Sequence, residues 1–442
     1  MPFFIREAFF RNSTAWFYLL YASCLVCLST RPRQLGGIER MVYRTEIHYI
    51  KKAHPLFKYC DEVCFKSKNL YNHTNYMIRQ QFFYLETFLT YDGQEYSLYF
   101  QVKDHETYKA LPAQTAEGIL KKLEDNWHSF FESMKEWKVN PSKFLGIPRP
   151  PKYKENNGRF TTFFTNQQCK VKNGWIRFPK TNLYITTRIS EPLHEVRITP
   201  EGNRYKIEIV HEHVVPEPAS TMPRKIASID LGLNNLVTLT DNIGDTPIVI
   251  NGRIAKSMNQ FYNKKKAKLM SFIGDKGTSN RLSKLSLKRE HKISDQMHKV
   301  SRFVVDWCID HGIDTLVVGK NDEWKQEINI GKKNNQAFVC IPFNDLVEKL
   351  VYKCEDAGIR FVETDESYTS KCSFLDRESI EHHDTYLGRR VKRGLFRSSN
   401  GTRINADVNG SYNILVKAFP EAMQLAGGDR GCALHPVRIN IT

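Results

Sequence analysis

Residues 226–240 read IASIDLGLNNLVTLT, and this stretch decides the fold class. Ile226 to Asp230 is a short apolar run that ends in a carboxylate, and Leu236 to Thr240 is a second apolar run. Two such runs separated by Gly and Asn are typical of adjacent strands. Because burying an unpaired carboxylate is costly, Asp230 is either a turn residue before Gly232 or a functional acid.

Strands and helices alternate downstream of this stretch, which is the pattern of an α/β domain. The apolar spacing predicts helices and buried strands in the order helix 281–311, strand 315–318, helix 344–357, strand 359–363 and helix 406–419. Asp407 lies at the start of the last helix, where an acid is also favoured by the helix dipole.

The order of these elements is that of an RNase H-like domain. In that fold the first strand is central and the last helix packs beside it, so Asp230 and Asp407 are expected to converge. Carboxylate oxygens are the ligands that hard cations prefer, and a pair of ions stabilises both the attacking and the leaving oxygen of a phosphodiester. The pair therefore predicts a site for two Mg²⁺ ions.

The chain upstream of residue 216 has a different pattern. Ala113 to Trp137 is an amphipathic helix, and the prolines between Pro141 and Pro151 predict an extended, rigid loop. Short strands from Phe160 to Val215 suggest a small β-barrel. The expected division is a leader (1–40), a barrel (41–60 and 151–215), a helical lobe (61–150), a linker (216–223), an α/β domain (224–420) and a tail (421–442).

The leader contains an apolar run from Ala15 to Leu28. It reads as a signal peptide, as a membrane span that falls short of the roughly 20 residues needed, or as a segment upstream of a true start at Met41. The third reading is favoured, because Met41 directly precedes a strand-like stretch.

The composition favours a nucleic-acid partner. The chain has 442 residues, 65 Lys and Arg against 48 Asp and Glu, and a net charge of +17. A hydrophobic fraction of 41% excludes a disordered chain, and 10 scattered Cys exclude a small disulfide scaffold. Reduced thiols and no expected membrane partner favour the cytoplasm or nucleoid, or the nucleus in a eukaryotic host.

Four stretches resemble the TnpB proteins of insertion sequences, whose relatives are the Fanzor proteins and the type V CRISPR effectors. They are residues 227–239, 316–343, 362–374 and 404–414. The resemblance implies a C-terminal RuvC-like nuclease domain of RNase H-like fold. It also implies an N-terminal β-barrel of the wedge type with an inserted helical recognition lobe. The implied partners are a guide RNA and double-stranded target DNA, with a monomer as the favoured state.

The sequence departs from this family at one catalytic position. The family usually has a Glu after the strand 315–318, whereas this chain has Gly319. Either the activity is lost, or the Glu has moved to the next strand, where Glu366 is the first choice and Glu363 the second. The alternative is that both are surface acids. The expected catalytic and Mg²⁺-binding set is thus Asp230, Glu366 and Asp407.

A second departure concerns zinc. Only Cys372 remains of the family's paired CxxC motifs, and His382 and His383 still leave fewer than four ligands, so no zinc is expected. Residues 371–402 are then a degenerate zinc-ribbon or lid insert. Asn405 and Asn413 flank Asp407 and are expected to orient it. Basic side chains expected to contact nucleic acid are Arg149, Lys152, Lys154, Lys264, Lys265, Lys266, Lys325, Arg389, Arg390, Lys392 and Arg393.

The function expected from these features is RNA-guided DNA cleavage. One alternative is a guided DNA-binding protein with a weak or dead nuclease, which Gly319 favours. The other is a guide-independent RuvC-like nuclease, against which the large basic N-terminal half argues. A strand-joining transposase is disfavoured because no tyrosine or serine recombinase motif is present.

Overall fold

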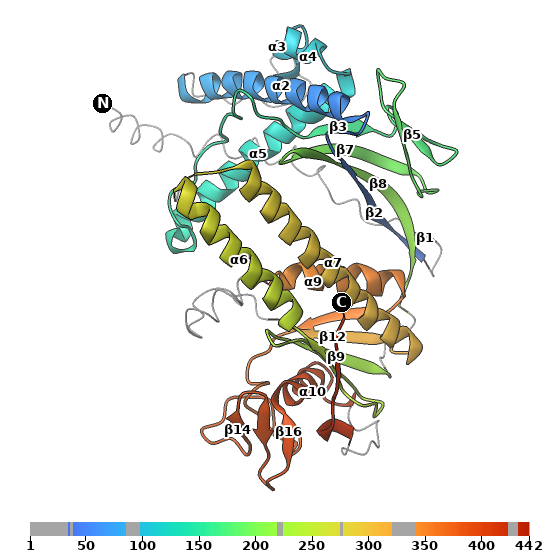
Figure 1. Ribbon diagram of the computed structural model, residues 1–442, viewed down its shortest axis with the longest axis vertical. Helices are drawn as coiled ribbons and strands as arrows, with labels where there is room; N and C mark the ends of the chain where they lie inside the picture. Colours follow the sequence, from blue (N-terminus) through green and yellow to red (C-terminus); the bar gives the residue numbers. More distant parts are fainter. Residues whose placement is uncertain are drawn as a thin grey trace.

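The computed structural model describes residues 34–35, 39–84, 98–218, 224–274, 277–320, 341–422 and 432–441. The apolar run at 15–28, most of the expected linker and Lys325 lie outside these residues. Within the described ranges, no helix is both long and apolar enough to span a bilayer. Figure 1 shows the N-terminal half at one end of the molecule and the C-terminal half at the other.

A six-stranded sheet in the order β13-β12-β9-β10-β11-β17 forms the centre of the C-terminal half. β10 runs antiparallel to both β9 and β11, whereas β12 is parallel to β9 and β13 is parallel to β12. This order and these directions are the RNase H-like arrangement, so the predicted fold class is confirmed. The strands are β9 (Ile226–Leu231), β10 (Asn235–Asp241), β11 (Ile248–Asn251), β12 (Thr315–Gly319), β13 (Arg360–Thr364) and β17 (Val437–Ile439).

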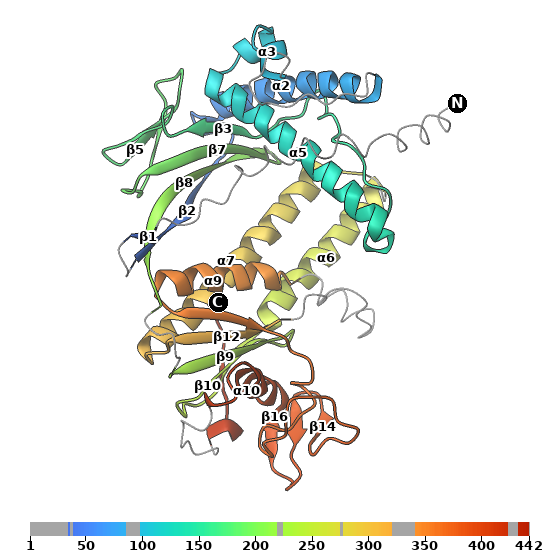
Figure 2. The same cartoon turned by 180° about the vertical axis from the view of Figure 1, so that it is seen from behind.

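Helices cover both faces of this sheet (Figure 2). Since side chains alternate along a strand, Ala227 and Ile229 of β9 face the helices α7 and α9. Ile226 faces the other way, toward Ile414 of α10. The alternation therefore points Asp230 toward α10. The helices are α6 (Arg253–Ile273), α7 (Asn280–Asp310), α9 (Phe343–Asp356) and α10 (Ala406–Ala418).

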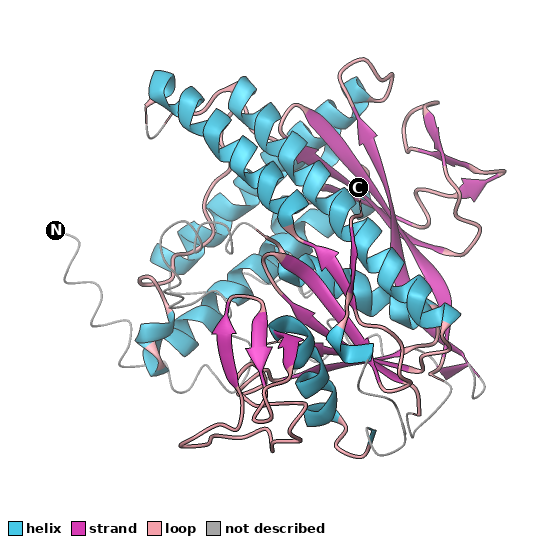
Figure 3. Ribbon diagram, turned by 60° about the horizontal axis from the view of Figure 1, so that its bottom comes forward, coloured by secondary structure: helices cyan, strands magenta, loops and turns pink. Residues whose placement is uncertain are grey.

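A small three-stranded sheet precedes α10 in the chain and packs beside it (Figure 3). It consists of β14 (Arg389–Lys392), β15 (Leu395–Arg397) and β16 (Arg403–Asn405), and the short helix η2 (Cys432–Leu434) contacts β16. Residues 437–439, in the segment expected to be a tail, instead form β17, which adds a parallel strand beside β11.

The described residues of the N-terminal half form two sheets that share one apolar core. The larger has the order β1-β2-β8-β7-β3, and the smaller consists of β4, β5 and β6. Together they are the strand-rich part expected to be a small barrel. Their bounds are β1 (Gln34–Leu35), β2 (Glu39–Ile50), β3 (Thr162–Thr165), β4 (Val171–Lys172), β5 (Trp175–Arg177), β6 (Tyr184–Thr186), β7 (Leu193–Glu201) and β8 (Arg204–Pro216).

Helices form a second core above these sheets. Ile119, Leu123 and Trp127 of the predicted amphipathic helix are buried, and the Trp127 indole donates to Asn75 Oδ1 at 3.0 Å. A buried indole with a partner for its N–H is the stable arrangement for this residue. The helices are α2 (Phe57–Tyr84), α3 (Leu98–Val102), α4 (Glu106–Lys109) and α5 (Ala113–Val139), with the short η1 (Pro141–Lys143) after them.

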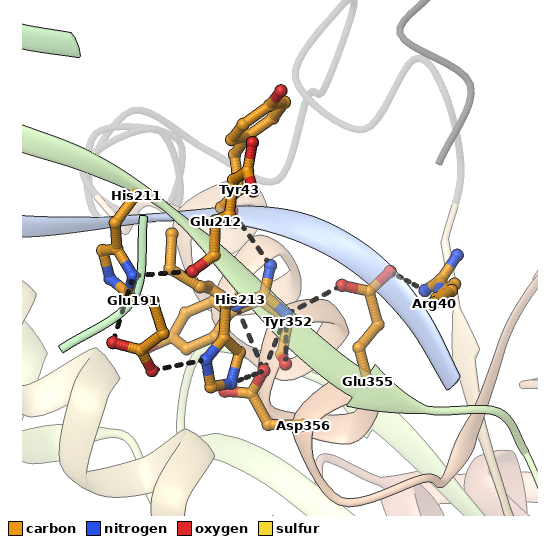
Figure 4. Close-up of polar contacts among 10 residues, drawn as sticks. Arg40, Tyr43, Glu191, His211, Glu212, His213, Tyr352, Glu355 and Asp356 are labelled. Atoms are coloured by element: carbon orange, nitrogen blue, oxygen red, sulfur yellow. Dashed lines mark hydrogen bonds and ion pairs between the residues drawn. The ribbon is translucent and has the colours of Figure 1, made fainter. Parts of the chain in front are cut away.

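A polar junction joins the larger N-terminal sheet to α9 (Figure 4). Arg44 of β2 donates to Asp356 Oδ1 at 2.7 Å and to Glu355 Oε2 at 3.1 Å, and Arg40 also pairs with Glu355. Nε2 of His213 in β8 lies 3.8 Å from Asp356 Oδ1. These contacts connect the sheet to the helix that covers the RNase H-like sheet.

Candidate active site

Asp230 lies near the end of β9 and faces α10. Upstream on the same face, Ser228 Oγ donates to the carbonyl of Ser411 at 2.7 Å, which fixes α10 against the strand. The helix presents Gly410 to the carboxylate, and a Cβ at that position would lie 3.0 Å from Asp230 Oδ2. The absence of a side chain at Gly410 therefore lets the helix approach Asp230 closely.

Asp407 lies in the first turn of α10. Asn405 caps the helix, because its Oδ1 accepts hydrogen bonds from the backbone N–H of Asp407 at 2.9 Å and of Val408 at 3.4 Å. Asn405 thus positions Asp407 through the backbone rather than through the carboxylate. The carboxylate itself is held by Asn235 at the start of β10, whose Nδ2 donates to Asp407 Oδ2 at 2.6 Å.

Glu366 follows β13 and reaches back over the end of β12. A Cβ at Gly319, the last residue of β12, would lie 2.7 Å from both Glu366 Cγ and Glu366 Oε1. The Glu366 side chain therefore occupies the space that a side chain at residue 319 would otherwise fill. The family that this chain resembles usually has Glu at the position of Gly319. A side chain at residue 319 and the side chain of Glu366 would thus occupy the same space.

The turn after Glu366 is fixed to α10. Asn413 Nδ2 donates to the carbonyls of Thr369 and Cys372, each at 2.8 Å. Asn409 adds a bond from its Nδ2 to the Cys372 carbonyl at 2.9 Å. Asn413 was expected to orient Asp407 but instead holds the segment that carries Glu366.

The electrostatics of Asp230 place the carboxylates in one cluster. The pKa of Asp230 is raised well above its usual value, first by burial and then by repulsion from Glu366 and Asp407, while Arg390 opposes the rise. Such mutual repulsion is the condition that a bound cation relieves. Glu363, the second choice, instead pairs with Lys320 at 2.8 Å, its side chain 41% exposed.

The donor set fits Mg²⁺, because it consists of carboxylate oxygens on three different elements. Among the described residues, no group of three His, Cys, Asp or Glu side chains is already close enough to hold an ion. The three carboxylates would therefore have to move closer together as the metal binds.

Arg390 of β14 brings the insert over this cluster. Its guanidinium lies 3.5 Å from Asp407 Oδ1. The insert is held in shape by Glu378, whose carboxylate accepts from the backbone N–H of Ser373 at 2.7 Å and of Leu387 at 2.8 Å. A carboxylate thus cross-links two segments of the insert.

The three residues weighed as zinc ligands make other contacts. The Cys372 thiol contacts the Glu381 carbonyl oxygen, and His383 Nε2 lies 2.8 Å from the Ser379 carbonyl oxygen. The His382 ring packs edge-on against Tyr368.

The basic residues expected at a nucleic-acid surface have different environments. Lys154 packs over the rings of Tyr71 and Phe160 at about 5 Å, and Arg390 lies at the carboxylates. The remaining described members of the set are exposed: Arg149, Lys152, Lys264, Lys265, Lys266, Arg389, Lys392 and Arg393.

Two members of the cluster were not assigned to it from the sequence. Asn235 belongs to the LNN turn between β9 and β10, and nothing in a single sequence separates it from the neighbouring Asn234. Arg390 was expected at a nucleic-acid surface, and its place beside Asp407 depends on how the insert folds back. A strand-end Asp followed by a polar hairpin is the available signal for Asn235.

Comparisons with known proteins find two family matches and two similar curated proteins. Residues 205–325 match a family described as a probable transposase (OrfB_IS605), and residues 343–414 match the Cas12f1-like TNB domain. A TnpB-like protein, ORF457 of Acidianus two-tailed virus, is 25% identical over 80% of this chain and 81% of its own length. The chain is thus similar in sequence to a TnpB-like protein over most of its length.

The Cas12f1 endodeoxyribonuclease of Sulfoacidibacillus thermotolerans is 31% identical over 27% of this chain and 26% of its own length. A solved Cas12f1 chain, in a complex with sgRNA and target DNA, covers 81% of this chain and 82% of its own, with 13% identity and a TM-score of 0.48. The two family matches divide the site, since the transposase match contains Asp230 and Gly319 and the TNB match contains Glu366 and Asp407.

Proposed function

We propose that this chain is an RNA-guided DNA endonuclease that hydrolyses phosphodiester bonds with Mg²⁺. The observation that carries the proposal is the convergence of Asp230, Glu366 and Asp407 on an RNase H-like sheet, with Gly319 leaving room for the Glu. The relationship to a TnpB-like protein and to an endodeoxyribonuclease supports it, as does the net charge of +17.

Each residue of the cluster has a role in this proposal. Asp230, Glu366 and Asp407 would hold two Mg²⁺ ions, which when bound supply charge neutralisation and a more acidic water. Asn235 would keep one oxygen of Asp407 in place by its hydrogen bond at 2.6 Å. Arg390 would offer positive charge beside the carboxylates, where a phosphate would have to lie.

Target choice would come from base pairing between the guide and one DNA strand, with the protein reading duplex shape and a short adjacent motif. In this proposal residues 224–420 form the nuclease domain, and the barrel and helical lobe hold the RNA and the duplex. The exposed lysines of α6, Lys264 to Lys266, would contact phosphates.

The test uses the full chain co-expressed with the DNA that flanks its gene, so that any guide co-purifies. The complex is incubated with a plasmid library that carries the guide-matched sequence next to random neighbours, with Mg²⁺ or with EDTA. We expect cutting that requires RNA and Mg²⁺ and is lost in Asp230→Ala. Binding that requires RNA but gives no cutting would replace the proposal with a guided DNA-binding protein, and cutting without RNA would replace it with a guide-independent nuclease.

A further inference from the structure

The small sheet of β4, β5 and β6 presents two aromatic side chains to solvent. Trp175 is 44% exposed and Tyr184 is 56% exposed, and their rings contact each other at 4.6 Å in an edge-to-face arrangement. The alternate residues Ile176 and Ile185 point inward and are buried in the core of the N-terminal half. The inner face of this sheet therefore packs in the apolar core, and the two aromatic rings lie on its outer face.

Cations surround this pair. Lys172 is the cross-strand partner of Trp175, and Arg177 is the cross-strand partner of Tyr184, so both share the outer face with the rings. Residues 156–190 contain six Lys or Arg and no Asp or Glu. A face with two exposed rings and an excess of positive charge attracts a polyanion whose units also carry flat rings.

A hollow adjoins this face. It has a volume of about 580 Å³, and its lining includes Lys170, Lys172, Arg177 and Lys180 together with Phe178. Lys172 and Arg177 thus belong both to the hollow and to the aromatic face. Phosphates in the hollow and bases on the rings would be bound side by side.

We infer that this surface, defined by Lys172, Trp175, Arg177 and Tyr184, binds unpaired nucleotides of an RNA by base stacking. Aromatic side chains beside a cationic groove are the general means of binding single-stranded nucleic acid, since every base has a flat face. The inference rests on the proposed function, because it names where that RNA is held.

The position of the surface favours the guide over the DNA being cut. Figures 1 and 2 place β5 at one end of the molecule and α10 and β14 at the other. A strand stacked on Trp175 is therefore remote from Asp407 and is not the strand undergoing chemistry.

The experiment measures binding of labelled 12-mers to the full chain in EDTA, so that cutting plays no part. The probes are oligouridine, oligodeoxyuridine and an abasic oligomer with the same ribose-phosphate backbone. The variants are Trp175→Ala, Tyr184→Ala and the conservative Trp175→Phe. Phe272→Ala is the matched control, because Phe272 is an exposed aromatic on a different element, α6.

We expect Trp175→Ala and Tyr184→Ala each to weaken oligouridine binding by about 5- to 50-fold. Trp175→Phe and Phe272→Ala should stay within about twofold of the parent protein, and the abasic probe should bind weakly and equally to all variants. Lys172→Gln should instead reduce the salt dependence of binding for every probe.

Three results would overturn the inference. Equal binding of the abasic probe and oligouridine by the parent protein would exclude stacking, and an unchanged affinity in both alanine variants would exclude this surface. Tighter binding of oligodeoxyuridine than of oligouridine would assign the surface to DNA. Guide-dependent cutting that persists alongside any of these results would leave the proposed function standing while removing this inference.

Discussion

Gly319→Ala would bring a methyl group against the Glu366 side chain. The new Cβ would lie 2.5 Å from Ile414 Cδ1 and 2.7 Å from both Cγ and Oε1 of Glu366. These separations are far below van der Waals contact, so the neighbours must move. Ile414 Cδ1 is the end of a flexible side chain and can rotate, whereas Glu366 Cγ can move only by swinging the carboxylate away from Asp230.

The expected effects on stability and on cutting differ in size. Inserting one methyl group into a packed site costs about 1–3 kcal/mol of the free energy of unfolding. A displacement of about 1 Å at a catalytic group costs about 100-fold in rate. We therefore expect Gly319→Ala to remain folded at 25 °C but to cut guided DNA at least about 50-fold more slowly than the parent protein.

The assay is the single-turnover rate of guided cleavage, measured beside thermal unfolding of the same preparations. Gly118→Ala is the matched control, because its Cβ would meet only Phe163 Cβ, at 3.5 Å, an ordinary contact. Gly118 lies inside α5, where Ala is preferred over Gly by about 1 kcal/mol. The control should cut at the parental rate and be equally or more stable.

A parental cleavage rate in Gly319→Ala would refute the reasoning, because Glu366 could not then depend on the space above Gly319. If Gly319→Ala loses both folding and cutting, Mg²⁺ binding is measured at a lower temperature at which the variant is folded. We expect the folded variant to bind Mg²⁺ more weakly than the parent protein.

Three further predictions concern charges. Asp230→Asn should raise the unfolding temperature of the metal-free protein, because burial, and then repulsion from Glu366 and Asp407, disfavour the charged carboxylate and raise the pKa of Asp230. Mg²⁺ should stabilise the parent more than this variant. Glu378→Ala should cost about 1–3 kcal/mol, since it leaves the buried backbone N–H of Ser373 and the part-buried N–H of Leu387 without their acceptor, and should speed limited proteolysis within residues 371–402. Burial and nearby cations lower the pKa of Lys353 in the folded protein from 10.5 to about 8. Between pH 8 and pH 10.5 the unfolded chain therefore binds more protons at this residue than the folded protein does. The contribution of Lys353 to stability accordingly rises with pH over this range. The stability of Lys353→Met relative to the parent should accordingly fall from pH 8 to pH 10, and a constant difference in urea unfolding would contradict this.

The RNase H-like sheet could be predicted because its signals are local. The apolar run that ends in Asp230 and the helix that begins at Asp407 specify their own elements, and the element order then specifies the topology. The pairing of the N-terminal strands is harder to predict, because a series of short strands in the sequence does not determine whether they form one closed sheet. They form two sheets around one core instead.

The rest of the site depends on contacts between distant segments. Glu366 is a candidate by resemblance, and only the structure shows that its side chain occupies the space above Gly319. Asn235 and Arg390 reach Asp407 from a hairpin and from the insert, over sequence separations that no local pattern records. The strand β17 (residues 437–439) is not predictable from the sequence, because three residues carry too little periodicity to indicate a strand.

The most direct test of the central claim compares Glu366→Gln with Glu363→Gln in guided, Mg²⁺-dependent cleavage of a matched plasmid. Both variants keep the size of the side chain and remove one charge, but only Glu366 lies against Gly319, whereas Glu363 pairs with Lys320. The account predicts that Glu366→Gln lowers the single-turnover rate by at least about 100-fold, typical of losing a catalytic group, while Glu363→Gln cuts within about twofold of the parent. Parental cutting by Glu366→Gln, or a loss confined to Glu363→Gln, would contradict the account.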